Sequence, residues 1–146
     1  MTDVEQMIMR QEGTGPMKDG VFYPYKDTAG LLTIGYGHCL ERKGLTLDLA
    51  FMLLKMDIGG AIADVRYHCS CYDMLSRARQ LVLVSMTFNL GRAGLAKWPR
   101  FLAAVHLGQW DEAADELLDS KAAREDAPAR YKELANMMRT GQSEWV

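Results

Sequence analysis

Long apolar runs are missing from this 146-residue sequence, and none approaches the roughly 20 residues that a membrane helix requires. The N-terminal stretch carries Asp3 and Glu5 and lacks the apolar core of a secretory signal. These two absences argue against a membrane-spanning protein and against a leader peptide. We therefore expect the chain to accumulate in the cytoplasm of the cell that makes it.

An excess of charge of one sign is also missing. The sequence has 17 basic and 19 acidic residues, which gives a formal net charge of −2. Such a chain has no basic field that would attract nucleic acid, and no electrostatic pull toward an anionic surface. We expect neither nucleic-acid binding nor stable membrane association, and we expect a monomer.

Cysteine is scarce, with three residues in an odd count that fits a reducing cytosol better than a disulfide framework. Two of them, Cys69 and Cys71, follow His68 closely, and all three are metal-ligand types. No second pair of ligands follows at the spacing of a zinc site. We therefore interpret the cysteines, Cys39 included, as ordinary free thiols and predict no metal.

Apolar residues make up 49% of the chain, which is enough for a core in one domain of common size. The patterning predicts an α+β, mainly α fold. It places a small N-terminal lobe with a short antiparallel β-sheet at about residues 1–45, a long connecting helix at about 46–67, and a helical C-terminal lobe at about 68–146. Two lobes joined in this way are expected to leave a ligand-binding cleft.

The N-terminal lobe begins with a predicted helix from Asp3 to about Glu12, capped by Thr2 or Asp3 and stopped by Gly13. A Gly-rich loop is expected at residues 13–20. Short strands follow, with the KDTAG turn between the first two; they are predicted at Val21–Tyr25, Leu31–Gly35 and Tyr36–Leu40.

The C-terminal lobe reads as a set of helices. An apolar stretch predicts a buried central helix that Gly91 ends, and Pro99 fits the first turn of the next helix, which Gly108 closes. Gly141 is the last stop signal. The central helix is predicted at Ser76–Leu90, and two further helices are predicted at Asp111–Ser120 and Pro128–Arg139.

Two acidic residues of the N-terminal lobe are candidates for chemistry. Glu12 ends a helix, where the dipole disfavours a carboxylate, and a general acid must hold its proton near neutral pH. Asp27 lies in the turn, and Thr33 follows six positions later (33 − 27 = 6) on the paired strand. Two facing carboxyls are what glycosidic cleavage needs. On spacing alone the alternative stays open that Asp27 is a turn residue and Glu12 a solvated helix end.

The string YKDTAGLLTIGYGH, preceded by a helix that ends in QEG, resembles the phage-type lysozymes, a glycoside hydrolase muramidase family of T-even phage lysozyme-like endolysins. The resemblance continues in RQLVLVSMTFNLGRAGLAKWPRF, in GQWDEAADELLDSK and in the closing RTGQSEW. It therefore spans nearly the whole chain. The segment between QEG and the turn is longer than in the T-even phage relatives.

The resemblance implies roles for individual residues. Glu12 matches the general acid, Asp27 the second carboxylate, and Thr33 the residue that helps to place the water. Substrate-binding positions match at His38, which is expected to orient or stabilise, and at Cys39, where the family has an apolar cleft residue. Phe88 matches an aromatic residue of the saccharide cleft, with core packing as its alternative, and Arg130 matches a basic residue near the cleft.

The resemblance implies an endolysin that hydrolyses the β-1,4 bond between N-acetylmuramic acid and N-acetylglucosamine in peptidoglycan, by inversion, without a cofactor. It further implies host lysis, with holin-dependent release from the cytoplasm to the wall. Two alternatives are a lytic transglycosylase and a catalytically silent wall-binding prophage remnant. The intact Asp27 and Thr33 argue against the first because both serve a water step, and three intact catalytic positions argue against the second.

Overall fold

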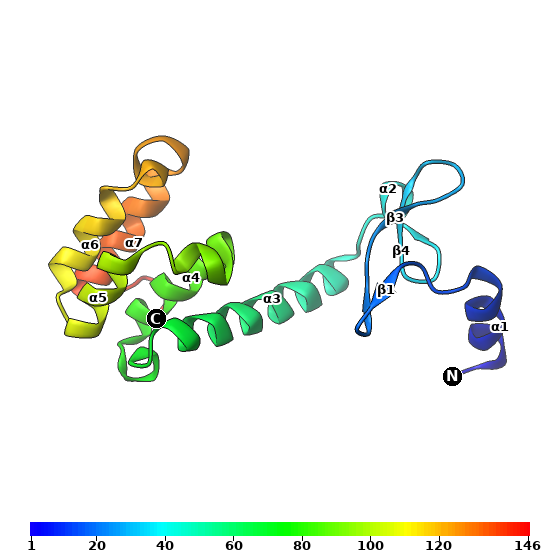
Figure 1. Ribbon diagram of the computed structural model, residues 1–146, viewed down its shortest axis with the longest axis horizontal. Coiled ribbons are helices and arrows are strands. Elements are labelled where there is room, and N and C mark those ends of the chain that lie inside the picture. The colour runs from blue at the N-terminus through cyan, green and yellow to red at the C-terminus, as the bar shows by residue number, and fades with distance from the viewer. The chain divides into compact units, whose positions relative to one another are not determined.

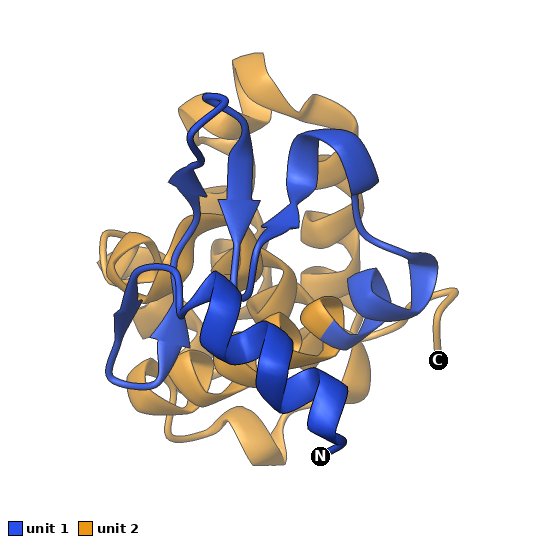
Figure 2. Cartoon of the chain, turned by 90° about the vertical axis from the view of Figure 1, so that its right-hand side faces the viewer, with its two compact units in different colours: residues 1–52 blue, residues 53–146 orange.

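The computed structural model describes residues 1–146, and the chain divides into two compact units, residues 1–52 and 53–146 (Figure 2). The predicted fold class is confirmed, because the chain is mainly helical with small antiparallel sheets on its N-terminal side (Figure 1). The predicted long helix is also confirmed as α3, Leu47–His68. The Thr46 hydroxyl accepts a hydrogen bond from the Leu49 N–H at 3.4 Å, which caps it.

The first unit begins with α1, Asp3–Glu12, as predicted. Thr2 and Glu5 form a reciprocal capping box, in which each side chain accepts a hydrogen bond from the other residue's N–H. Gly13 ends the helix at φ 68°, and its N–H bonds to the Met9 carbonyl at 3.1 Å. Local capping therefore fixes the position of Glu12 as the last residue of α1.

The predicted loop at residues 13–20 and the predicted strand Val21–Tyr25 are wrong in detail. The structure has a hairpin of β1, Met17–Lys18, and β2, Val21–Phe22. Asp19 and Gly20 join these strands with φ values of 52° and 78°, the positive values of a two-residue hairpin turn. Pro24 then stops β2 from continuing, because it lacks the N–H that a ladder requires.

A second sheet carries the candidate chemistry. It contains β3, Tyr25–Lys26, β4, Leu32–Ile34, and β5, His38–Cys39, in antiparallel order with β4 in the centre. The predicted strand Tyr36–Leu40 is too long, because Leu40 already begins α2, Leu40–Lys43. The Glu41 carboxylate of α2 accepts from the Leu32 N–H at 2.8 Å and from Lys26 at 2.9 Å. These bonds fold α2 back onto β3 and β4.

The second unit is helical throughout (Figure 1). After α3 come a short 3₁₀ turn η1, Tyr72–Met74, and α4, Arg77–Leu95, in which Gly91 at φ 67° interrupts the helix where it was predicted to end. The remaining elements are α5, Pro99–Leu107, α6, Trp110–Leu118, the π-turn η2, Ala122–Asp126, and α7, Pro128–Thr140.

The predicted helix Asp111–Ser120 ends two residues early because Ser120 takes another role. Its hydroxyl donates to the Leu117 carbonyl at 2.9 Å and accepts from the Ala123 N–H at 3.0 Å, which turns the chain into η2. Pro99 and Pro128 each open a helix, and Gly108 and Gly141 each close one in the left-handed conformation, as predicted.

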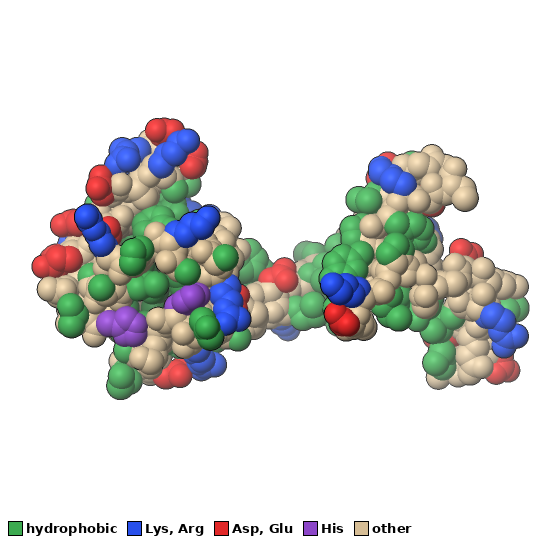
Figure 3. Space-filling view, viewed as in Figure 1, with side chains coloured by type: hydrophobic (Ala, Val, Ile, Leu, Met, Phe, Trp, Pro, Cys, Tyr) green, Lys and Arg blue, Asp and Glu red, His purple; other side chains and the backbone are tan.

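The core of the second unit surrounds α4, whose buried side chains include Val82, Leu83 and Met86. Arg79 of α4 is held at the end of α7. Its Nε donates to the Met138 carbonyl at 2.9 Å, and its guanidinium lies 3.8 Å from the centre of the Trp110 ring. Figure 3 shows basic and acidic side chains interspersed on the visible face. None of the helices combines the length and the apolar character that crossing a bilayer requires.

Candidate active site

Asp27 lies directly after β3 and opens the turn to β4. Its Oδ1 accepts hydrogen bonds from the Ala29 and Leu31 N–H groups, each at 2.9 Å. The backbone of the same turn is closed by the Asp27 N–H, which bonds to the Leu31 carbonyl at 3.0 Å, and by the Gly30 N–H, which bonds to the Asp27 carbonyl at 2.9 Å. This turn therefore holds the carboxylate in one orientation with Oδ1 occupied and Oδ2 left for other partners.

These bonds lower the pKa of Asp27. The Leu31 N–H is the largest cause, partial burial opposes it, and the Ala29 N–H, the Thr33 hydroxyl and the charge of Arg42 add smaller effects. Hydrogen bonds from backbone N–H groups favour the charged form of a carboxyl. Asp27 is therefore a carboxylate at neutral pH, which suits the activation of water and does not suit a general acid.

Thr33 lies in the middle of the central strand β4 and is only 2% exposed. Its hydroxyl is 3.2 Å from the Leu31 carbonyl and 3.5 Å from Asp27 Oδ2. A hydroxyl has one proton, so the Leu31 carbonyl and Asp27 Oδ2 are alternative acceptors for it, and 3.5 Å is at the outer limit of a hydrogen bond. The Thr33 oxygen thus keeps lone pairs beside Asp27 Oδ2, where both atoms can accept from one water.

Glu12 reaches the same sheet from α1. Its Oε2 lies 3.0 Å from the position that a Cβ on Gly37 would take, and Gly37 is in the turn between β4 and β5. The Gly15 N–H also bonds to the Gly35 carbonyl of this turn at 3.2 Å. The end of α1 is therefore fastened to the far end of β4. Asp27 thus lies in the turn before β4, Thr33 lies within β4, and Glu12 lies against the turn after β4.

His38 and Cys39 form β5, on the other side of β4 from β3. His38 Nε2 is 2.8 Å from the Gly44 carbonyl, which anchors the ring to the loop after α2. Cys39 pairs with Thr33 across the strands and is 9% exposed, so it is a buried neighbour of Thr33 in the sheet. Direct contact of either side chain with a ligand stays a prediction.

Phe88 and Arg130 lie in the second unit, where they line one pocket of about 440 Å³. Phe88 is 44% exposed, so it is not fully packed in the core, and its contact with a saccharide stays a prediction. Arg130 donates to Asn89 at 2.8 Å and to Ser85 at 3.3 Å. The same pocket is lined by Leu54, Ile58, Leu81, Val84, Glu133, Leu134, Met137 and Trp145.

The family model described as phage lysozyme matches residues 19–136, which is most of the chain. This chain belongs to the phage lysozyme family. Asp27, Thr33, His38, Cys39 and the second-unit pair Phe88 and Arg130 fall inside the matched range. Glu12 precedes it, so its assignment as the acid of this lysozyme-family chain depends on the QEG motif and on its contact with Gly37.

Relatives of this phage lysozyme family member include larger phage proteins. It is 26% identical over 136 residues to the pre-baseplate central spike protein Gp5 of Enterobacteria phage T4, covering 74% of this chain and 23% of the relative. It is 26% identical over 149 residues to the peptidoglycan hydrolase gp36 of Enterobacteria phage SP6, covering 85% and 15%. The chain thus spans less than a quarter of either phage relative.

A third relative is similar in size. The probable T4-type lysozyme 2 of Dictyostelium discoideum is 24% identical over 147 residues, covering 80% of this chain and 85% of the relative. The matched region is therefore found both inside long phage proteins and as the greater part of a short one.

Among the residues of the second-unit pocket that sequence reasoning did not identify, Trp145 and Glu133 are joined by a hydrogen bond. The Trp145 indole N–H donates to Glu133 at 3.1 Å, and both side chains line the pocket with Phe88. A single Trp near the C-terminal end was the available signal, because an aromatic ring with a polar edge suits a binding surface. Glu133 gave no signal, because its helix carries several charged residues.

Proposed function

We propose that this chain is a muramidase that hydrolyses the β-1,4 bond between N-acetylmuramic acid and N-acetylglucosamine in bacterial peptidoglycan. The observation that carries the proposal is that Thr33 of β4 lies 3.5 Å from Asp27 in the turn before this strand, while Glu12 lies against Gly37 in the turn after it. Membership of the phage lysozyme family and the printed name of the SP6 relative, a peptidoglycan hydrolase, support the same substrate class.

Within this proposal the two carboxyl groups have different catalytic roles. Glu12 is exposed at the end of α1 and donates a proton to the glycosidic oxygen. Asp27 has a lowered pKa and stays anionic, so it accepts a proton from the attacking water. Thr33 accepts the second hydrogen of that water and thereby aims the oxygen at the anomeric carbon.

The spacing of the two groups supports inversion. Glu12 contacts the turn that follows β4, and Asp27 opens the turn that precedes it. The three residues of β4 alone span about 7 Å. Inverting enzymes separate their carboxyls by about 6.5–9.5 Å to admit a water, whereas retaining enzymes place them about 5–5.5 Å apart. A strand between the carboxyls favours the wider arrangement.

The remaining predicted residues complete the proposal. Phe88 and Trp145 offer ring faces to the apolar face of a sugar, and Arg130 offers N–H donors to its hydroxyl, amide or lactyl oxygens. His38 holds β5 in place through its bond to the Gly44 carbonyl, and Cys39 supports Thr33 from the neighbouring strand β5. The biological role that we propose is host-cell lysis by an endolysin that crosses to the wall after a holin opens the membrane.

The decisive test is product analysis on purified peptidoglycan. The wild-type protein is compared with Glu12→Gln and with a matched control, Glu5→Gln, which removes a carboxylate from the same helix. Glutamine also serves in the capping box, so the control keeps α1 intact. We expect reducing N-acetylmuramic ends from wild type and control, and a loss of at least about 100-fold for Glu12→Gln, the scale of general acid catalysis.

Each other outcome has a clear meaning. Anhydro ends in place of reducing ends would identify a lytic transglycosylase. Wall binding without products from the wild-type protein would identify a silent binding module. Equal rates for Glu12→Gln and Glu5→Gln would remove Glu12 from the mechanism. The anomer released in the first seconds, read by NMR, separates inversion from retention.

A further inference from the structure

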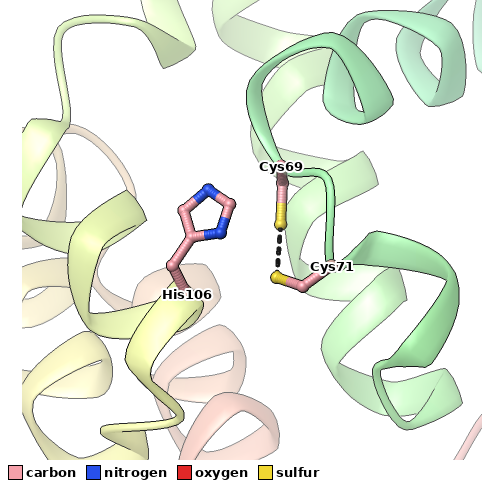
Figure 4. Close-up of side chains that lie close together, drawn as sticks. All are labelled: Cys69, Cys71 and His106. Atoms are coloured by element: carbon pink, nitrogen blue, oxygen red, sulfur yellow. Dashed lines mark hydrogen bonds between the residues drawn. The ribbon is translucent and has the colours of Figure 1, made fainter.

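Two cysteines and a histidine meet in the second unit, away from the residues assigned to the reaction. Cys69 and Cys71 lie in the segment between α3 and η1, and His106 lies in the last turn of α5 (Figure 4). One ligand atom from each of the three lies within 4.8 Å of the other two. His106 is 37 residues from Cys69 and 35 residues from Cys71 in the sequence (106 − 69 and 106 − 71). No short-range spacing therefore indicated that it lies beside them.

The burial of the three side chains leaves one open side. Cys69 is 0% exposed, Cys71 is partly buried, and His106 is exposed. The two sulfur atoms are 3.1 Å apart, and all cysteines are free thiols. An ion can therefore approach past His106 from solvent and reach two sulfur atoms that are shielded on their far side.

The tautomer of His106 is fixed by a backbone contact. Its Nε2 is 3.3 Å from the His68 carbonyl, which can only accept, so Nε2 carries the proton. Nδ1 is then the unprotonated nitrogen, and Figure 4 shows the ring facing the two sulfur atoms. A metal-binding histidine usually donates its other N–H to a carbonyl or carboxylate in this way.

The adjacent histidine in sequence is not a ligand. His68 Nε2 is 3.1 Å from the Arg92 carbonyl, so its ring is engaged elsewhere while its own carbonyl orients His106. That carbonyl also belongs to the C-terminal end of the 22-residue helix α3, and His106 lies at the C-terminal end of α5. The partial negative charge of helix C-termini favours a cation nearby.

From this geometry we propose that Cys69, Cys71 and His106 bind a thiophilic cation of the zinc(II) type, with a solvent molecule as fourth ligand. Two thiolates and one imidazole are a donor set that zinc accepts in tetrahedral sites with an open position. Binding releases the two thiol protons to solvent. Metal–sulfur bonds of about 2.3 Å at tetrahedral angles place the sulfur atoms about 3.8 Å apart, so they separate slightly from 3.1 Å as the ion enters.

The proposal is tested by titrating the fully reduced protein with Co²⁺, followed by displacement with Zn²⁺. We expect one equivalent of Co²⁺, thiolate-to-cobalt charge-transfer absorption, and release of the Co²⁺ by one equivalent of Zn²⁺. His106→Gln and Cys71→Ser each weaken binding by more than about 100-fold, which exceeds the cost of losing an outer-shell partner. Both side chains are at least partly exposed, so neither variant depends on repacking the core.

Matched controls are His68→Gln, which removes the neighbouring imidazole and keeps the backbone carbonyl, and Cys39→Ser, which removes the thiol of the first unit. Both are expected to bind Co²⁺ as the wild type does. Equal binding by His106→Gln would remove the imidazole from the site and overturn the proposal. No uptake by the reduced protein, with a mass loss of two hydrogens on air oxidation, would also overturn it and assign Cys69 and Cys71 to a disulfide.

Discussion

The contact between Gly37 and Glu12 permits a sharp test of how the proposed acid is positioned. Gly37 has a φ of 75°, and a Cβ there would lie 3.0 Å from Glu12 Oε2. In Gly37→Ala the carboxyl must retreat by about 0.4 Å to reach an ordinary contact distance. A misplacement of about 1 Å costs about 100-fold in rate, so a shift of this size is expected to cost about 3- to 10-fold.

The matched control is Gly35→Ala in the same turn. Gly35 also has a positive φ, of 63°, but a Cβ there meets no atom within 4 Å. Both variants force an alanine into the left-handed region, which costs about 1 kcal/mol of stability in each. They differ in the contact with Glu12, so the difference in their activities isolates that contact.

The assay measures kcat on solubilised glycan strands together with the free energy of unfolding from urea titration. We expect similar losses of stability in the two variants and a selective loss of kcat in Gly37→Ala. Equal kcat values would refute the reasoning, because Glu12 would then work without support from the β4–β5 turn. A larger kcat loss in Gly35→Ala would refute it equally.

Three further predictions concern stability. Asp27 has a lowered pKa in the folded state, so its contribution to the free energy of unfolding is present above the unfolded pKa near 3.8 and is lost as pH falls through the folded value. The loss of stability in Asp27→Asn, measured by urea titration, should therefore shrink below about pH 4. A loss that stays constant with pH would contradict this. Phe101→Ala, at a fully buried core position, should cost about 3–5 kcal/mol by urea titration, and a cost below about 1 kcal/mol would contradict the packing. Arg79→Ala should cost about 2–4 kcal/mol by losing the Met138 carbonyl and the Trp110 ring, with Arg79→Lys intermediate, and equal stability of the three proteins would contradict it.

The helices were predictable because their ends carry strong local signals. The capping residue Thr2, the helix-opening Pro99 and the stop at Gly141 each act through the nearest few residues, and all three lie where predicted. The strands were predicted less well. The Asp19-Gly20 turn is also a local signal, but the glycines around it favoured a loop, and a two-residue strand has no periodicity to detect.

The site was predictable only as a set of residue types. That Asp27 and Thr33 meet follows from the turn between two paired strands, which a sequence can indicate. That Glu12 lies against Gly37 depends on how α1 docks on the β4–β5 turn, and no sequence pattern encodes that contact. The proximity of His106 to Cys69 and Cys71 could not be predicted for the same reason, because the histidine comes from another helix. The cleft between the lobes stays a prediction.

The hydrogen bonds from Arg79 to the end of α7 affect how the second unit folds during synthesis. Its bonds to the Met138 and Arg139 carbonyls bridge 59 and 60 residues. Partial burial lowers the pKa of Arg79, a sign that its charge gives up water when it enters this position. Until residue 139 has emerged from the ribosome, these carbonyls cannot bond to Arg79 and offset its loss of hydration. We therefore expect a nascent chain that stops before α7 to remain open around α4, and to close only when the last helix has emerged.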